Sequence, residues 1–243
     1  MTAAGSGHPD NLSELDPGSR GGWPTGTDHP RTVRTFTPRF RVSELTKQRM
    51  TELLPRYAVS LPLDPVGAFG RSAPLVLEIG SGHGAAAIGY ALANPGHDVL
   101  TAEVHLPGVV RMLAAAQQRG AQNIRVYPED AMHLLGGGLA DHSVHAIHLL
   151  FPDPWPKAKH AKRRFVQPTT LAAFRRLLVP GGTLLVATDH PVYAAWVREQ
   201  FAADDGFVVS EVARPSWKDE DGFEGKGAAA GRPSVYFQAV ARD

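Results

Sequence analysis

The stretch LVLEIGSGHG, residues 75–84, decides the fold of this chain. Its first half is a mostly apolar segment typical of a strand, and glycine then occupies every second position from Gly80 to Gly84. The next segment, AAAIGYALANPG (85–96), predicts a helix that is closed by a Pro-Gly pair. A strand, a glycine-rich turn and a helix in this order predict the first unit of an α/β sheet.

Strands and helices alternate along the rest of the chain. Apolar segments predict further strands at residues 98–105, 123–130, 143–151 and 183–189. The segments between them predict helices at residues 107–120, 169–178 and 191–202. This alternation implies a doubly wound, mostly parallel α/β sheet with right-handed crossovers. The last two strands, 206–212 and 234–242, have no helix between them, so we expect a seven-stranded sheet whose last strand is antiparallel.

The chain begins with a segment that is too polar to bury a core. Residues 1–30 are rich in Gly, Pro, Ser and Asp, and we expect a disordered tail there. Residues 31–243 then form one domain, of which residues 31–57 are a basic and helical extension.

Within the extension, RTVRTFTPRFR (31–41) interleaves arginines with two phenylalanines. Both a basic surface strip with anchoring aromatic residues and an RNA contact remain open for this segment. After it we expect a helix at residues 44–54, with Ser43 as its N-cap and Pro55 as its terminator.

The bulk composition bounds the class of protein. The 243 residues, 43% of them hydrophobic, suffice for one substantial core, and a net charge of +1 argues against a protein that coats nucleic acid indiscriminately. The chain has no cysteine, which excludes disulfides, thiolate catalysis and cysteine-based metal sites. No apolar run approaches about 18 residues and no signal peptide is recognisable, so we expect a cytoplasmic protein without membrane contact. The sequence does not distinguish a monomer from a homodimer.

Carboxylates stand at the ends of the first three predicted strands, beside the glycine loop. They are Glu78, Glu103 and Asp130. Doubly wound sheets bind ligands at this edge, and Gly80, Gly82 and Gly84 let a ligand approach the backbone. Together with Ala85 the glycines also fit the G-x-G-x-x-A pattern, so a dinucleotide-dependent oxidoreductase remains an alternative. Three acids favour a ligand with a ribose, an amino group and an adenine over a ligand with a pyrophosphate.

The most unusual stretch is FPDPWPKAKHAKRRF, residues 151–165. Asp153 lies between two prolines, which restrict its backbone, and Trp155 follows. A cluster of cations comes next: Lys157, Lys159, His160, Lys162, Arg163 and Arg164. One carboxylate held rigidly beside so many cations is unusual, and a solvated basic turn after a strand remains one alternative for this stretch.

Two sets of motifs resemble known families. LEIGSGHG, Glu103, Asp130 and LLVPGG resemble the class I S-adenosylmethionine-dependent methyltransferases, and FPDPWPK with its cations is similar to the tRNA (guanine-N7-)-methyltransferases. The resemblance extends from residue 31 to the C-terminus and is most specific at residues 151–164. It implies a Rossmann-like methyltransferase sheet, S-adenosylmethionine as cofactor and tRNA as partner, with methylation at N7 of the guanosine at tRNA position 46. A methyltransferase acting on another RNA or base remains the main alternative.

The resemblance also implies roles for the acids. Glu103 would hold the ribose hydroxyls, Asp130 the adenine amine, and Glu78 with the three glycines the methionine end of the cofactor. Asp153 would face the methyl group, contact the cofactor and act as the catalytic residue. Guanine N7 carries a lone pair and no proton, so its methylation needs no general base, but it leaves a positive charge that a fixed carboxylate stabilises. Trp155 would stack on the base.

The same resemblance marks substrate contacts. Lys157 and Asp189 would contact the guanosine, and the expected RNA contacts are Trp155, Lys159, Lys162, Arg163 and Arg164. The family shows Thr-Lys/Arg-Phe-Glu near the C-terminus, where this chain has Asp221, Gly222, Phe223 and Glu224. Two of these positions differ from the family, which removes a hydroxyl and a cation. Trp217 and Lys218 just upstream are candidates to compensate.

Metal binding is not expected from the histidines. His142, His145 and His148 recur every third residue, but adjacent members of the series point to opposite faces of the predicted strand. The altered C-terminal motif leaves one further alternative, a non-catalytic RNA-binding module.

Overall fold

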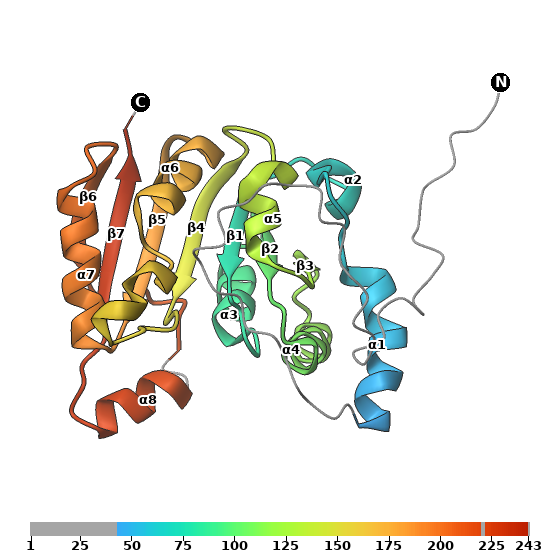
Figure 1. The fold of residues 1–243 in the computed structure, drawn as a ribbon. Coiled ribbons are helices and arrows are strands. Elements are labelled where there is room, and N and C mark those ends of the chain that lie inside the picture. Colours follow the sequence, from blue (N-terminus) through green and yellow to red (C-terminus); the bar gives the residue numbers. More distant parts are fainter. Residues whose placement is uncertain (1–42, 220–221, 243) are drawn as a thin grey trace.

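A seven-stranded sheet with the order β3-β2-β1-β4-β5-β7-β6 forms the centre of the computed structural model, which describes residues 43–219 and 222–242 (Figure 1). The strands are β1 (Leu75–Ile79), β2 (Asp98–Ala102), β3 (Ile124–Tyr127), β4 (Val144–Leu150), β5 (Leu178–Thr188), β6 (Phe207–Val212) and β7 (Val235–Ala241). Neighbours among β1 to β5 pair in parallel, whereas β7 runs antiparallel to β5 and β6. The predicted mostly parallel, seven-stranded sheet with an antiparallel last strand is confirmed.

Helices cover both faces of this sheet (Figure 1). They are α1 (Glu44–Tyr57), α2 (Pro65–Phe69), α3 (Ala85–Ala93), α4 (Leu106–Arg119), α5 (Ala131–His133), α6 (Pro168–Leu177), α7 (Pro191–Ala202) and α8 (Gly222–Ala229). A π-helical turn spans Leu134–Gly138 and a 3₁₀-helix spans Ala158–Arg163. Residues of α1, α3 and α4 share one core cluster, and residues of α6 and α7 share another on the opposite face.

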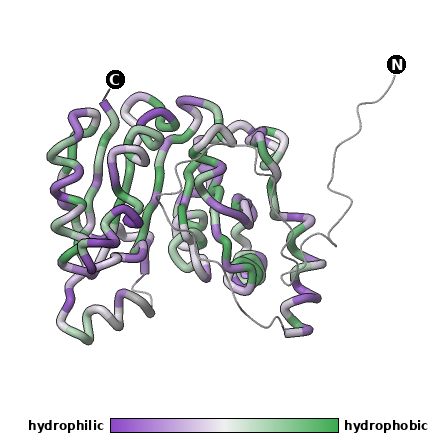
Figure 2. Tube along the Cα trace, in the orientation of Figure 1, coloured by the Kyte–Doolittle hydropathy of each residue, from purple (hydrophilic) through white to green (hydrophobic). Residues whose placement is uncertain are grey.

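The central strand β1 shows how the sequence produces two layers. All of its residues are buried, with Leu75 and Leu77 in the core under α6 and α7 and Val76 in the core under α3 and α4. Glu78 lies on the side of Val76 because side chains alternate along a strand. Figure 2 shows the hydrophobic residues concentrated along the inner strands. A carboxylate in such a strand needs a reason beyond stability.

Helix α1 is longer than the sequence predicts. Ser43 is its N-cap and accepts a hydrogen bond from the Thr46 N–H, as expected. The helix continues through Pro55 to Tyr57, so the prediction that Pro55 ends it is wrong. Burial of Tyr57 and the bond from the Ala58 N–H to the Leu54 carbonyl oxygen hold the last turn in place. Tertiary packing here outweighs the local effect of proline.

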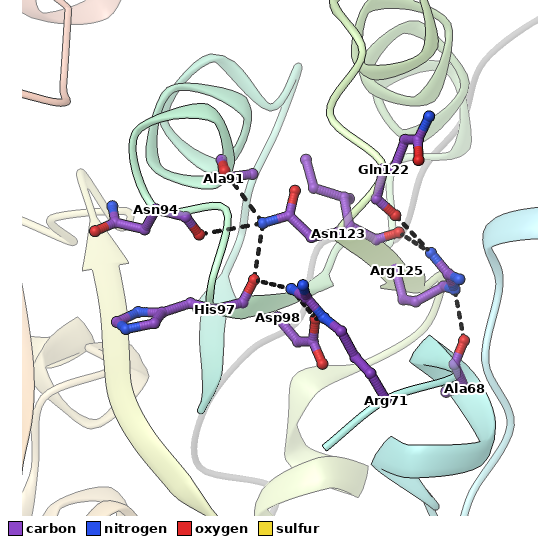
Figure 3. A network of polar contacts seen from close by, with 10 residues as sticks. Ala68, Arg71, Ala91, Asn94, His97, Asp98, Gln122, Asn123 and Arg125 are labelled. Carbon is purple, nitrogen blue, oxygen red and sulfur yellow. Dashed lines mark hydrogen bonds and ion pairs between the residues drawn. The ribbon is translucent and has the colours of Figure 1, made fainter. Parts of the chain in front are cut away.

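A polar network holds the amino ends of β2 and β3, at the edge of the sheet opposite the carboxyl ends of these strands (Figure 3). Asp98 at the start of β2 is 1% exposed and accepts from Arg71 Nε at 2.8 Å. Asn123, just before β3, donates to the carbonyl oxygens of Ala91, Asn94 and His97. Buried polar groups are therefore satisfied at this edge, which leaves the carboxyl edge for the site.

Two predictions concern parts of the chain outside the description. The expected tail at residues 1–30 and the basic strip at residues 31–41 lie beyond the described residues. Among the helices of the described ranges, none has the length and apolar character required to cross a membrane.

Candidate functional site

The glycine loop after β1 has a backbone that glycine adopts most easily. Gly80, Gly82 and Gly84 have φ values of 72°, 56° and 77°, in the left-handed region. A Cβ at Gly84 would overlap the buried side chain of Met112, and a Cβ at Gly108 would lie 2.7 Å from the Gly82 carbonyl oxygen. The loop and the first turns of α3 and α4 are therefore in close contact, and their peptide groups meet at the carboxyl edge of β1.

Glu103 follows β2 and joins this loop to α4. Its Oε2 accepts from the Gly82 N–H at 2.7 Å, and its Oε1 accepts from the His105 N–H at 2.8 Å. A carboxylate has about four acceptor positions, so it can still accept from ligand hydroxyls. Glu103 therefore holds the loop and presents a negative charge at the rim of the sheet.

The other two strand-end acids differ from each other in their surroundings. Asp130 follows β3 and caps α5 by accepting from the Met132 N–H at 2.9 Å. Glu78 is only 2% exposed, and its Oε2 has no hydrogen-bond partner among the described residues. Because β3, β2 and β1 are consecutive in the sheet, the three acids lie at neighbouring strand ends. The predicted set is brought to one edge.

Asp153 lies in the loop that leaves β4, the strand beside β1. Phe151 and Trp155, on either side of it, have positive φ values of 52° and 40°. Such angles cost about 1–3 kcal/mol each in a non-glycine residue, so surrounding contacts must hold the loop. One contact is the bond from the Phe151 N–H to the Ala187 carbonyl oxygen at 2.8 Å. Asp153 itself is exposed and pairs with no residue that the structure describes.

The cations after Asp153 form two groups. Lys157, Lys159 and Lys162 are exposed. Arg163 is half-buried, and its guanidinium lies 4.9 Å from the centre of the Trp155 ring. These four cations all follow Asp153 within ten residues of the chain, and we call them the positively charged rim.

Arg164 differs from the prediction of a phosphate contact. It is 5% exposed, and its Nε and Nη2 donate to the Trp155 carbonyl oxygen at 3.3 and 3.1 Å. Its guanidinium also lies 4.7 Å from the centre of the Trp196 ring on α7. Such burial leaves little of the guanidinium for RNA, so in this structure Arg164 holds the loop from inside.

Asp189, directly after β5, lies under α8. Its Oδ2 accepts from Arg232 Nε at 3.1 Å and Nη2 at 3.0 Å. A Cβ at Gly227 of α8 would lie 2.6 Å from the same oxygen, so the helix backbone is close to this carboxylate. The sequence did not indicate Arg232, because it lies 43 residues from its partner.

Glu224 of α8 is buried in a polar cluster. Its Oε2 accepts from Lys218 Nζ at 2.8 Å and its Oε1 accepts from the Tyr236 hydroxyl at 2.8 Å. Lys218 is 3% exposed, and its Nζ also lies 5.1 Å from the centre of the Phe151 ring. The residues before α8 are thereby joined to the loop that carries Asp153.

The rest of the C-terminal motif is described only in part. Asp221 lies outside the described residues, and for Gly222 and Phe223 the structure describes their place in α8 and no side-chain contact. The role of this motif as a substrate contact therefore stays a prediction.

His83 in the glycine loop has a lowered pKa. Its partial burial and then the positive charge of Arg111 hold the pKa below its usual value of 6.5. Arg111 Nη1 lies 3.5 Å from His83 Nε2. The burial of His83 and its proximity to Arg111 therefore favour the neutral imidazole.

The site lies where the strand order reverses. The chain moves outward from β1 to β2 and β3, and then returns to the other side of β1 as β4. Doubly wound sheets bind their ligands at this switch point, beyond the carboxyl ends of the strands. Both β1 and β4 point to the lower edge in Figure 1, the edge where α8 also lies.

Comparisons with known proteins agree with this architecture. Residues 72–222 match a family described as "Putative methyltransferase". The 16S rRNA (adenine(1408)-N(1))-methyltransferase from Catenulisporales acidiphilia aligns with a TM-score of 0.51 at 18% identity, covering 74% of this chain and 94% of that chain, which shows a shared fold.

Two relatives are closer in sequence. The tRNA (guanine-N(7)-)-methyltransferase of Halorhodospira halophila is 42% identical over 73% of this chain and 79% of its own length. The protein of the same name from Alcanivorax borkumensis is 41% identical over 83% of this chain and 88% of its own length. At this identity and coverage, the chain belongs to the tRNA (guanine-N(7)-)-methyltransferase family.

Proposed function

We propose that this protein transfers a methyl group from S-adenosylmethionine to N7 of a guanosine in tRNA, at position 46 of the variable loop, in the cytoplasm. The observation that carries the proposal is Asp153, an exposed carboxylate without a partner among the described residues, held at the switch point beside a positively charged rim. The family membership supports the same reaction.

The residues at the carboxyl edge fit the cofactor. Glu78 has a buried oxygen without a hydrogen-bond partner in the described ranges, as expected for a group that awaits an ammonium donor. Glu103 would accept from the ribose hydroxyls and Asp130 from the adenine amine, while Gly80, Gly82 and Gly84 admit the methionine end to the backbone. The bound sulfonium supplies an activated methyl group.

Asp153 would act by electrostatics rather than as a base. Guanine N7 carries no proton, so the chain has none to remove at the attacking atom. A carboxylate already in place stabilises the charge that develops on the purine and accepts from its N–H groups without reorganisation. Trp155 would stack on the base, and alignment of N7 with the methyl group would supply most of the rate.

The RNA would be held by the charged rim. Lys157, Lys159, Lys162 and Arg163 would contact phosphates or the guanosine, because the three lysines are exposed and all four cations follow Asp153 within ten residues of the chain. Asp189 and Glu224 already pair with Arg232 and Lys218, so we propose that they shape the substrate side by holding α8 in place.

Replacement of Asp153 tests the proposal. We expect Asp153→Asn to lower kcat for 7-methylguanosine formation by at least about 100-fold, the usual effect of removing one electrostatic stabiliser. Binding of S-adenosylhomocysteine, measured by calorimetry, should stay unchanged. The product is measured by mass spectrometry of nucleosides from tRNA incubated with the full-length protein.

Asp205→Asn, at an exposed turn between α7 and β6, is the matched control and should retain full activity. Methylation of a different nucleoside would select another specificity within the same fold. Full product formation by the Asp153→Asn variant would contradict the assigned role.

A further inference from the structure

His148 is a buried imidazole of β4 that the proposed chemistry does not use. It is in register with Glu78 of the neighbouring parallel strand, so both side chains lie on the same face of the sheet. The residues are 4% and 2% exposed. His148 Nδ1 lies 3.9 Å from Glu78 Oε2, and neither atom has a hydrogen-bond partner within the described part of the chain.

Two facing polar atoms without partners are unusual in a core. Buried polar groups nearly always make a hydrogen bond, and a separation of 3.9 Å is longer than such a bond allows. Hydrogen-bonded atoms of this kind lie about 2.9 Å apart, so closing a gap of about 1 Å would form the bond. The pair is therefore in register for a bond that this structure does not show.

Two aromatic residues fix the plane of the imidazole. The Trp217 ring stacks on it with centroids 5.0 Å apart and an interplanar angle of 16°, and the Tyr90 ring meets it edge-on at 4.9 Å. Trp217 belongs to the segment before α8, and its carbonyl oxygen lies against α3, where a Cβ at Gly89 would approach within 2.5 Å. The orientation of His148 therefore depends on how this segment docks.

We propose that His148 is a positioning residue for cofactor binding, which donates from Nδ1–H to one acceptor position of Glu78 Oε2 while the cofactor's ammonium group donates to the other. The proposal rests on the assignment of Glu78 to the cofactor. Since Trp217 holds the imidazole, docking of the C-terminal segment and cofactor binding favour each other, and this coupling is reciprocal.

Two substitutions at residue 148 separate the donor from the ring. In His148→Asn the amide nitrogen is bonded to Cγ, as Nδ1 is in histidine, so the hydrogen-bond donor is kept and the stacking on Trp217 is lost. In His148→Phe the stack is kept and the donor is lost. We expect His148→Phe to weaken the binding of S-adenosylhomocysteine to the full-length protein about tenfold in calorimetry, and His148→Asn to stay within about threefold of wild type.

Trp217→Ala completes the test. Like His148→Asn, it loses the stack and keeps the donor, so it should weaken S-adenosylhomocysteine binding by at most about threefold in the wild-type background and add nothing to His148→Phe, where the donor is already lost. The exposed His145 on the same strand provides the control, and His145→Phe should bind like wild type. Equal affinities for the Asn and Phe variants at residue 148 would overturn the proposal, since loss of fold or of packing does not depend on the donor.

A failure of the proposal for His148 can be told apart from a failure of the proposed function. A wild-type protein that binds S-adenosylhomocysteine but forms no 7-methylguanosine would refute the substrate and leave the test of His148 intact. A wild-type protein that binds no S-adenosylhomocysteine would overturn the role of His148 together with the cofactor.

Discussion

Gly84 illustrates how one residue can be fixed for two separate reasons. Its φ of 77° is strained for any side chain, and a Cβ there would also overlap Met112, which is fully buried. Gly82 in the same loop has a φ of 56°, but a Cβ there would meet no atom within 4 Å. The two positions therefore separate backbone strain from steric overlap.

We expect Gly82→Ala to lower the free energy of unfolding by about 1–2 kcal/mol, the cost of left-handed backbone in a residue with a Cβ. Gly84→Ala should lose about 1–3 kcal/mol more, because Met112 must shift within a packed core. Urea unfolding of the protein without cofactor measures both values. If both variants lost the same free energy of unfolding, Met112 would be shown to shift at little energetic cost, contrary to this prediction.

The sequence predicts that Arg164 contacts RNA, but its contacts in the structure indicate that it holds the Asp153 loop. A lysine at this position keeps the charge but cannot stack on Trp196 while donating twice to the Trp155 carbonyl oxygen. We expect Arg164→Lys to lower kcat at least about tenfold, since small displacements of reacting groups are costly. Steady-state kinetics with tRNA as the varied substrate provide the measurement.

Lys159→Ala is the comparison for Arg164, because Lys159 is exposed in the same cation cluster. It should raise KM for tRNA and leave kcat unchanged. If Arg164→Lys likewise altered only KM, the result would support the phosphate contact that the sequence predicts and contradict the structural role.

At the scale of elements, the 3₁₀-helix at Ala158–Arg163 carries the charge expected to neutralise phosphates. Each phosphate contact to a duplex contributes about 0.9 to the slope of log K against log salt. We expect Lys159→Ala and Lys162→Ala each to reduce this slope by about that amount, and the double variant to reduce it by about twice as much. Fluorescence anisotropy with labelled tRNA over a range of potassium chloride concentrations measures the slope.

Lys47 on α1 serves as the control for the salt dependence, because its Nζ already pairs with Glu44 at 2.8 Å. Lys47→Ala should leave the slope as it is in the wild type. An unchanged slope in the double variant would remove the 3₁₀-helix from the RNA interface.

Local signals predicted the elements well and their ends less well. Three features could be predicted correctly, because each depends on residues close in sequence. They are the glycine loop, the alternation of strands and helices, and the helix at Leu106–Arg119 with Gly120 beyond it. Pro55 was misread because contacts of Tyr57 decide where α1 ends. β5 begins at Leu178, earlier than predicted, because Leu178 pairs with Val144 before the turn at Gly181.

The site shows the same division. Glu103 and Asp130 could be placed from their positions at strand ends alone. The sequence could not place three neighbours of the acids, because each contact depends on how distant segments pack. They are Arg232 at Asp189, Tyr236 at Glu224 and His148 at Glu78. The burial of Arg164 likewise follows from α7, which supplies Trp196.

At the scale of the whole molecule, the two edges of the sheet have separate tasks. The polar network of Arg71, Asp98 and Asn123 closes the amino edge, and the candidate site occupies the carboxyl edge (Figure 3). Asp98 and Glu103 are five residues apart across β2, about 16 Å at about 3.3 Å per residue. Stability and binding should therefore respond independently to changes at the two edges.

The ion pair of Arg71 with Asp98 tests this separation, because Asp98 is 1% exposed and its neutralisation leaves the Arg71 guanidinium without its carboxylate. We expect Asp98→Asn to lower the free energy of unfolding by about 2 kcal/mol, between the values for exposed and buried pairs, since the Arg71 side chain is 41% exposed. Glu211→Gln breaks the exposed pair with Arg198 and should cost at most about 1 kcal/mol. Urea unfolding gives both values, and calorimetry should show unchanged S-adenosylhomocysteine affinity in both variants. If Asp98→Asn weakened that affinity in a protein that is still fully folded, the two edges would be coupled through β2, contrary to the independence argued from their separation.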